Sequence, residues 1–308
     1  MRIAPSPKQP SAADVELHRI TTWPFRSWCE ECAKGRGLGE QRGTHAGRAH
    51  DVPIVGLDYF YMTEKGLEHR SEITMSDAEV KTARECGDIV LCLIIRCYNS
   101  KNVFCHVVPC KGDDEDKFVV NLAVEDIGWL GHTRVIIKSD QERSLVSLVT
   151  RALEVLKCKV EALEIVSVEH SQKYASQASG GTEVGARADR GLFRTMRLCI
   201  EKRTGRRLPV RHPLSSWLLE HVSLLLNACV RGEDGLTSWA RARGRAFGQR
   251  LIGFGEKVLW KMQTKGPQHN AEGNMSARWA VGIFIGYNRS SDSYRFITDG
   301  GARIYFAF

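Results

Sequence analysis

Three acidic residues could do chemistry together, and the first of them lies inside a strand, where a carboxylate is costly to bury unless it is paired or binds a metal. Asp58 lies inside the apolar and aromatic run 52–62, which predicts a central strand. Asp140 follows the short apolar run 134–139, a buried strand of the parallel type, at the strand end where α/β sheets place ligand sites. Glu183 opens a helix predicted over 183–203. Each acid also has a structural explanation: a satisfied core or turn Asp58, a helix N-cap at Asp140, and a favourable helix-dipole position for Glu183.

Convergence of these acids would predict a metal site. Three carboxylates repel one another unless divalent cations lie between them, and hard oxygen ligands favour Mg²⁺ or Mn²⁺. Two such ions can support an in-line phosphoryl displacement. Arg187, Arg190 and Arg194 follow Glu183 at helical spacing and predict a basic face that neutralises DNA phosphates. The alternative is an intrahelical pair between Glu183 and Arg187, worth only ~0.3–0.5 kcal/mol.

A second group of residues has the character of a zinc site. Cys29 and Cys32 have the two-residue gap that lets one turn present both thiolates to a zinc ion, and His18 lies upstream. These are three ligands, whereas a closed structural site needs four. His45 or His50 can supply the fourth, but the spacing requires neither.

Composition and charge narrow the class of protein. The 308 residues carry a net charge of +8, and residues 196–250 alone hold eleven Lys/Arg against four Asp/Glu, which favours a polyanion partner such as DNA. The alternative is ordinary helix solvation. The ten cysteines are scattered, so reduced thiols in an intracellular protein are expected rather than a disulfide framework. Neither a signal peptide nor a transmembrane-length apolar run is apparent, and no membrane association is expected.

The elements that must position the acids follow from hydrophobic patterning. Runs 52–62, 88–98 and 102–111 predict a three-stranded antiparallel meander, followed by a helix over 114–130. A strand over 134–139, a helix over 142–157 and a strand over 162–168 come next. Residues 169–182 predict a polar loop. After a further helix through Trp217 and Val230, strands are expected at 257–262, 280–287, 294–298 and 303–308.

Local motifs resemble one known family. His18, the run Pro24-Phe25-Arg26-Ser27-Trp28-Cys29, and Cys32 look like the N-terminal zinc module of retrotransposon integrases, with Thr22 where that module has its second His. Leu57-Asp58-Tyr59-Phe60 and Lys138-Ser139-Asp140-Gln141-Glu142 resemble the first two acidic motifs of the integrase core. The run 176–183 resembles the third, Gln-x-Asn-Gly-x-x-Glu, with Ser179 in place of Asn. Glu169 is a competing third acid.

The resemblance extends over residues 18–308, including His221 and the region around Trp279, and it implies an architecture. That architecture is an α/β, ribonuclease-H-like core with a mixed five-stranded sheet and flanking helices, between a small N-terminal zinc-finger-like module and a small C-terminal β module. The expected boundaries are 1–50, 51–250 and 251–308. His221 is predicted to be a helix-packing residue rather than a metal ligand.

The resemblance also implies a function. Asp58, Asp140 and Glu183 are the expected catalytic and metal-binding residues of a DDE-type polynucleotidyl transferase, with two Mg²⁺ or Mn²⁺ ions. Gln177 and the three arginines are the expected DNA-binding residues. The expected activity is 3′-end processing and strand transfer by a homo-oligomer that acts on element ends and target DNA in the nucleus. The alternatives are a nuclease of the same fold and a catalytically inactive, nucleic-acid-binding relic.

Overall fold

The structure is a computed structural model, and it describes residues 10–36, 52–159, 164–171, 180–261, 277–291, 293–298 and 301–305. For 164–167, 169–171, 180–184 and 301–305 the description covers the backbone. None of the helices within these ranges combines the length and apolar character needed to cross a membrane.

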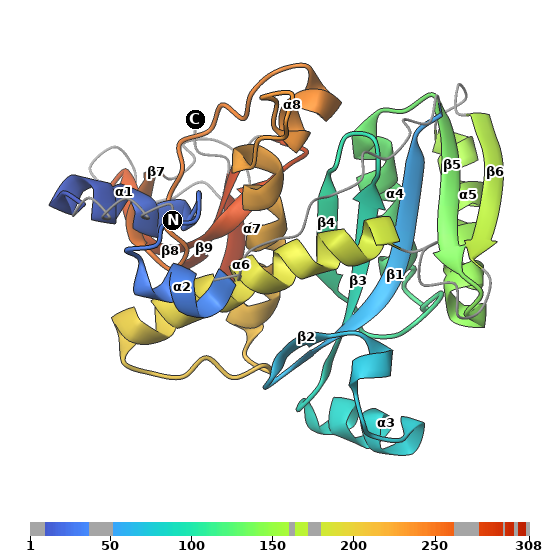
Figure 1. Ribbon diagram of the computed structural model, residues 1–308, viewed down its shortest axis with the longest axis horizontal. Helices are drawn as coiled ribbons and strands as arrows, with labels where there is room; N and C mark the ends of the chain where they lie inside the picture. Colours follow the sequence, from blue (N-terminus) through green and yellow to red (C-terminus); the bar gives the residue numbers. More distant parts are fainter. Residues whose placement is uncertain are drawn as a thin grey trace, which may run out of the picture.

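The larger sheet has the order β4-β3-β1-β5-β6 (Figure 1). Its strands are β1 (Ile54–Thr63), β3 (Val90–Cys97), β4 (Val103–Val107), β5 (Arg134–Asp140) and β6 (Glu164–Ser171). β1, β3 and β4 form an antiparallel meander, whereas β5 pairs with β1 and with β6 in parallel. A short β2 (Gly66–Glu68) forms a hairpin with β1. This mixed five-stranded order confirms the predicted ribonuclease-H-like fold.

Helices cover both faces of this sheet because β1 alternates between two cores. Its odd-numbered residues, including Leu57 and Tyr59, join a cluster with α4 (Phe118–Leu130) and α5 (Arg143–Lys159). Its even-numbered residues Phe60 and Met62 join a second cluster with α6 (Gly180–Thr204) and α7 (Pro213–Cys229). Successive side chains of a strand point to opposite faces, so a strand buried on both sides must be apolar throughout. In β1 every residue is buried except Asp58.

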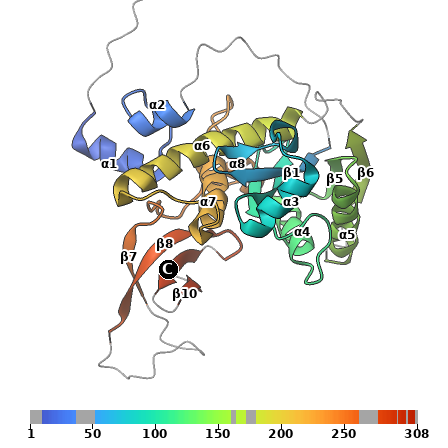
Figure 2. The same cartoon turned by 90° about the horizontal axis from the view of Figure 1, so that it is seen from below.

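Helix α6 connects the two halves of the molecule. Figures 1 and 2 show it running from the N-terminal helices at one end to the larger sheet at the other. The N-terminal helices are α1 (Ala12–Thr21), which begins with a Ser11–Asp14 capping box, and α2 (Glu30–Arg36), which packs on α6. Gly35 is required at this contact, because a Cβ atom there would lie 2.2 Å from the Oγ1 atom of Thr195.

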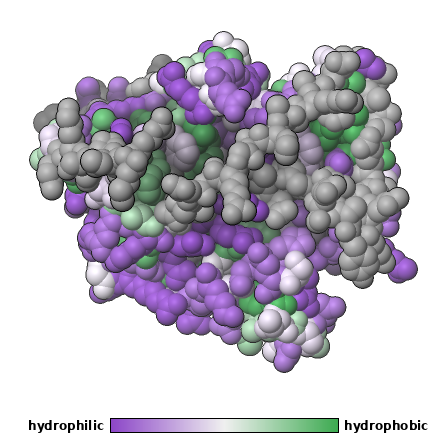
Figure 3. Space-filling view, in the orientation of Figure 1, coloured by the Kyte–Doolittle hydropathy of each residue, from purple (hydrophilic) through white to green (hydrophobic). Residues whose placement is uncertain are grey.

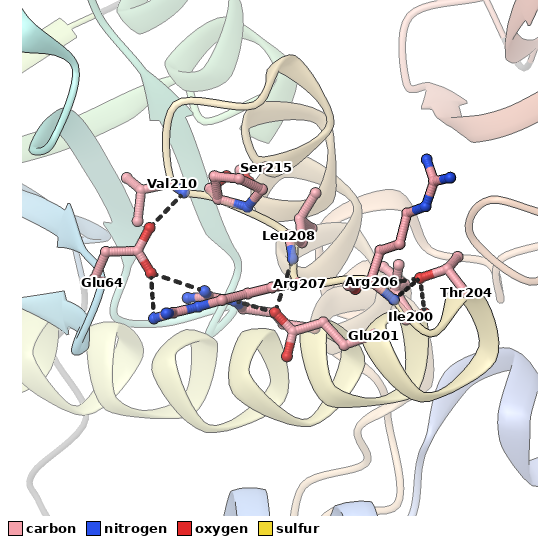
Figure 4. Close-up of polar contacts among 11 residues, drawn as sticks. Glu64, Ile200, Glu201, Thr204, Arg206, Arg207, Leu208, Val210 and Ser215 are labelled. Carbon is pink, nitrogen blue, oxygen red and sulfur yellow. Dashed lines mark hydrogen bonds and ion pairs between the residues drawn. The ribbon is translucent and has the colours of Figure 1, made fainter.

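A polar network fixes α6 against the β1–β2 hairpin (Figure 4). The carboxylate of Glu64 accepts hydrogen bonds from the backbone N–H of Val210 at 3.1 Å and from the guanidinium groups of Arg197 and Arg207 at 3.1 and 2.7 Å. Glu201 accepts from the backbone N–H of Leu208 at 2.9 Å. The network therefore holds the turn between α6 and α7 beside the end of β1. Between β2 and β3 lie η1 (Arg70–Glu72) and α3 (Asp77–Cys86).

The C-terminal sheet is antiparallel, with the order β10-β9-β8-β7. It comprises β7 (Lys257–Lys261), β8 (Trp279–Asn288), β9 (Ser293–Thr298) and β10 (Gly301–Tyr305), and it follows α8 (Ser238–Arg243). Leu224 of α7 packs against a cluster from this sheet that includes Trp260 and Phe284. His221 is buried among Phe254, Phe284 and Tyr287, and burial lowers its pKa to about 3. That placement agrees with the predicted packing role.

A buried ionic cluster joins this sheet to the core. The Nε2 atom of His106 on β4 lies 2.7 Å from the Oδ2 atom of Asp126 on α4, and Arg289 from the β8–β9 turn bonds the same carboxylate. The Nδ1 atom of His106 lies 3.3 Å from Glu220 of α7, which accepts from Arg295 of β9 at 2.7 Å. Asp126 is only 1% exposed, and every one of its charged partners comes from a different element.

Candidate functional site

Asp58 and Asp140 occupy adjacent positions on neighbouring parallel strands. In the register of β1 and β5, Gly56 pairs with Lys138 and Leu57 with Ser139, so the next residues along the two strands are the two acids. Residues in register on parallel strands point to the same face, and the strands lie about 4.8 Å apart. The topology therefore brings together two carboxylates from positions 82 residues apart in the sequence.

Each carboxylate accepts a hydrogen bond from the backbone N–H group of the next residue and remains accessible to solvent. The backbone N–H groups of Tyr59 and Gln141 donate to the Oδ1 atoms of Asp58 and Asp140, each at 2.8 Å. The side chain of Asp58 is 28% exposed, and Asp140 is exposed. Helix α5 begins only at Arg143, so Asp140 does not occupy the N-cap position and that alternative explanation does not apply.

The imidazole of His69 lies against the first of these acids. Its Nε2 atom lies 3.5 Å from the Oδ2 atom of Asp58. The hydrogen bond to Asp58 raises the pKa of His69 above its ordinary value against the effect of burial, and the charges of Glu72 and Asp140 add to the increase. His69 was not predicted as a site residue. The available signal was its place just after the hairpin that ends the Asp58 strand.

The third predicted acid lies on the helix that covers this face. α6 begins at Gly180, so Glu183 is in its first turn, and its side chain lies outside the described part of the chain. Gly185 lies against Arg96 of β3, which pairs with Gly56, and Arg197 bonds Glu64 at the end of β1. α6 therefore passes over the stretch of β1 that holds Asp58. Glu169, the competing acid, has its backbone in β6 opposite Lys138, and Gln177 lies outside the described residues.

The predicted DNA-binding arginines have different surroundings. Arg187 is exposed. Arg190 donates from both terminal nitrogens to the carboxylate oxygens of Glu72, at 3.0 and 2.9 Å. Arg194 donates to the backbone carbonyl of Gly35 at 3.3 Å. Arg190 and Arg194 are therefore engaged by protein groups, and hydrophilic side chains dominate the lower part of the face seen in Figure 3.

The N-terminal cluster consists of the predicted ligands. The ligand atoms of His18, Cys29 and Cys32 all lie within 4.8 Å of one another, and the three side chains are buried. The Nε2 atom of His18 lies 3.1 Å from the Sγ atom of Cys32. Burial raises the pKa of the Cys29 thiol to about 11, so a cation would be needed to hold it as thiolate. One imidazole and two thiols are donors that zinc prefers, and this cluster could bind it.

Comparisons with known proteins give limited help. No protein-family model matches the sequence, and no curated protein matches it. The chain is similar to a chain in a cryo-electron microscopy structure of a simian T-cell lymphotropic virus intasome in complex with the PP2A regulatory subunit B56 gamma. The two are 12% identical over 91% of this chain and 85% of that chain, with a TM-score of 0.41.

Proposed function

We propose that this chain is a retroelement integrase that processes DNA 3′ ends and joins them to target DNA with divalent metal ions. The placement of Asp58 beside Asp140 carries the proposal, because two accessible carboxylates on adjoining strands form a preorganised site for a hard cation. Glu183, in the first turn of α6, is the proposed third ligand. The family resemblance of the three acidic motifs agrees with these assignments.

The chain's own residues have distinct proposed roles in the reaction. Asp58, Asp140 and Glu183 hold Mg²⁺ or Mn²⁺, which when bound activates an attacking oxygen and stabilises a leaving one. Arg187 and Arg190 neutralise DNA phosphates next to the acids, and Gln177 contacts the DNA end. Water is the first nucleophile, and the exposed 3′ hydroxyl is the second. Neither step requires a covalent bond between the protein and DNA.

Strand transfer of a labelled terminal-repeat duplex by the purified chain tests the proposal. We expect joined product with Mg²⁺ or Mn²⁺, and no product from Asp140→Asn. Asp88→Asn is the matched control, because Asp88 is an exposed aspartate between α3 and β3 and its substitution should leave the product unchanged.

The other outcomes identify the alternatives. Cleavage of the duplex without joining would point to a nuclease that uses the same acids. DNA binding without either reaction, in both metals, would point to a catalytically inactive relic. In both cases the integrase proposal would be wrong.

A further inference from the structure

The N-terminal cluster is one ligand short of a closed zinc site. Tetrahedral structural zinc takes four protein ligands, and His18, Cys29 and Cys32 supply three. Thr22 stands where the integrase module has a second His. Its hydroxyl donates to the carbonyl of Thr21 at 2.7 Å, and its own carbonyl accepts from the Cys32 thiol at 3.4 Å. The side chain of residue 22 therefore does not complete the ligand set.

Helix α6 carries a cysteine on the face that packs against α2. α2 is anchored on α6 at two points: Gly35 contacts Thr195, and Lys202 bonds Glu31, with Nζ 2.7 Å from Oε1. Cys199 lies four residues after Thr195 and three before Lys202, so all three share one face of α6. Gly35 lies at the Thr195 end of the contact between the two helices, and Glu31 lies at the Lys202 end. Cys199 therefore faces the middle of α2, where Cys32 lies.

The surroundings of Cys199 agree with this placement. The residue is partly buried, and burial raises the pKa of its thiol to about 12. The charge of Glu31 adds to the increase in the pKa of Cys199, as Cys29 and Cys32 would in their thiolate forms. Arg203 acts in the opposite direction on the same thiol and can balance part of the charge of an added thiolate.

We propose that Cys199 is the fourth ligand of a zinc site formed with His18, Cys29 and Cys32. Its sulfur does not belong to the group of ligand atoms that lie within 4.8 Å of one another, so binding requires the side chain to rotate toward the cluster. The ligand set would be one His and three Cys, a known structural zinc combination. Such a site would bond the N-terminal helices to the core through α6. This inference does not depend on the DNA chemistry proposed above.

Glu31 is the main competing ligand. Its Oε2 atom lies 3.4 Å from the Sγ atom of Cys29. Its carboxylate is already engaged by Lys202, and thiolate is the softer donor that favours zinc over harder cations. The pairing of Glu31 with Lys202 and the softness of the thiolate donor therefore favour Cys199 over Glu31.

Cobalt substitution of the full-length chain tests the ligand set. Reduced protein is titrated with Co²⁺, and the thiolate-to-cobalt absorption is followed together with zinc affinity by competition with a chelator. We expect Cys199→Ser to lower the charge-transfer intensity by about one third, because three thiolates become two. We also expect zinc affinity to fall by more than the roughly 10–100-fold that loss of an outer-shell partner costs. Cys158→Ser is the matched control, because Cys158 is an exposed thiol on α5.

Further variants separate a lost ligand from a lost fold. Adding Thr22→His to Cys199→Ser should restore tetrahedral cobalt bands with two thiolates, and this rescue would not follow from a merely structural role of Cys199. His is among the residues that tolerate the left-handed backbone of position 22, where φ is 53°. An unchanged spectrum in Cys199→Ser would overturn the proposal, as would loss of binding in Glu31→Gln alone. Absence of cobalt binding by the wild-type chain would overturn the zinc site as a whole while leaving strand transfer unaffected.

Discussion

Two groups of acids in this molecule have opposite surroundings. Asp126 and Glu220 share an ionic cluster with His106, Arg289 and Arg295, in which each carboxylate contacts two cationic side chains. Asp58 and Asp140 lie at adjacent positions of two neighbouring strands, and the imidazole of His69 lies 3.5 Å from Asp58. Buried charges must be paired, whereas neighbouring carboxylates without sufficient counter-charge identify a place for a cation. The comparison separates acids that hold the fold together from acids available for chemistry.

The largest expected effect is the loss of activity when Asp58 is substituted. Asp58→Asn should reduce strand transfer by about 10³-fold or more, because the proposed metal ligand, worth several kcal/mol to the transition state, would be lost. The melting temperature should stay the same or rise, since repulsion between Asp58 and Asp140 is relieved. A parallel fall in melting temperature and activity would show that Asp58 is a structural residue like Asp126.

Asp126→Asn should have the reverse effect. Removing this charge leaves His106 and Arg289 without their shared counter-ion in a buried site, so we expect a loss of about 3–5 kcal/mol in the free energy of unfolding. Strand transfer per folded molecule should be retained. Urea denaturation measures the first effect, and the second is measured below the melting temperature of the variant. An unchanged unfolding free energy would contradict the assigned structural role.

The buried cluster should also make stability depend on pH. Burial alone would lower the pKa of His106, but Asp126 and Glu220 outweigh this effect and raise that pKa to about 9. Arg289 and Arg295 complete the cluster. A group whose pKa is raised on folding stabilises the folded state fully at pH values below its unfolded pKa. This stabilisation is lost as the pH rises through its folded pKa. Unfolding free energy should therefore decline between about pH 6.5 and 9, by about 3 kcal/mol. His106→Gln should remove this decline, and its persistence would assign it to another group.

The smallest expected effect is the change in DNA affinity when Arg190 is substituted. Arg190→Ala should flatten the dependence of log K on log salt by about one unit if Arg190 contacts a phosphate. Glu72 holds Arg190 through two hydrogen bonds, so Glu72→Gln should release it and tighten DNA binding. Fluorescence anisotropy over a salt series measures both variants. Equal slopes for Arg190→Ala and the wild-type chain would remove Arg190 from the DNA-binding surface.

The strands that carry Asp58 and Asp140 could be predicted because the sequence pattern that marks them is local. A carboxylate inside the aromatic run around Asp58, and another at the end of the run before Asp140, are visible without knowing the topology. Their strands were predicted within a few residues, and so was α6, although it begins three residues before the predicted start. The helix at 77–86 was not predicted, although Ser76 and Glu79 form a capping box.

The buried ionic cluster and the partners of the arginines could not be predicted in this way. His106, Asp126, Glu220 and Arg295 lie on four elements and Arg289 on the β8–β9 turn, and in the sequence each resembles an ordinary surface charge. The pairing of Glu72 with Arg190 joins residues 118 positions apart. Such contacts depend on how the elements pack, and no local pattern encodes them. The position of Cys199 opposite α2 has the same origin.

The length of α6 also fixes the distance between the acidic site and the N-terminal cluster. An uninterrupted helix rises 1.5 Å per residue, so the sixteen residues from Glu183 to Cys199 place their backbones roughly 24 Å apart. That separation is convenient for pulsed electron paramagnetic resonance between one label near the acids and another on α1. A narrow distribution would mean that the N-terminal helices remain seated on α6. A broad one in the presence of DNA would mean that they leave it and can reach another molecule.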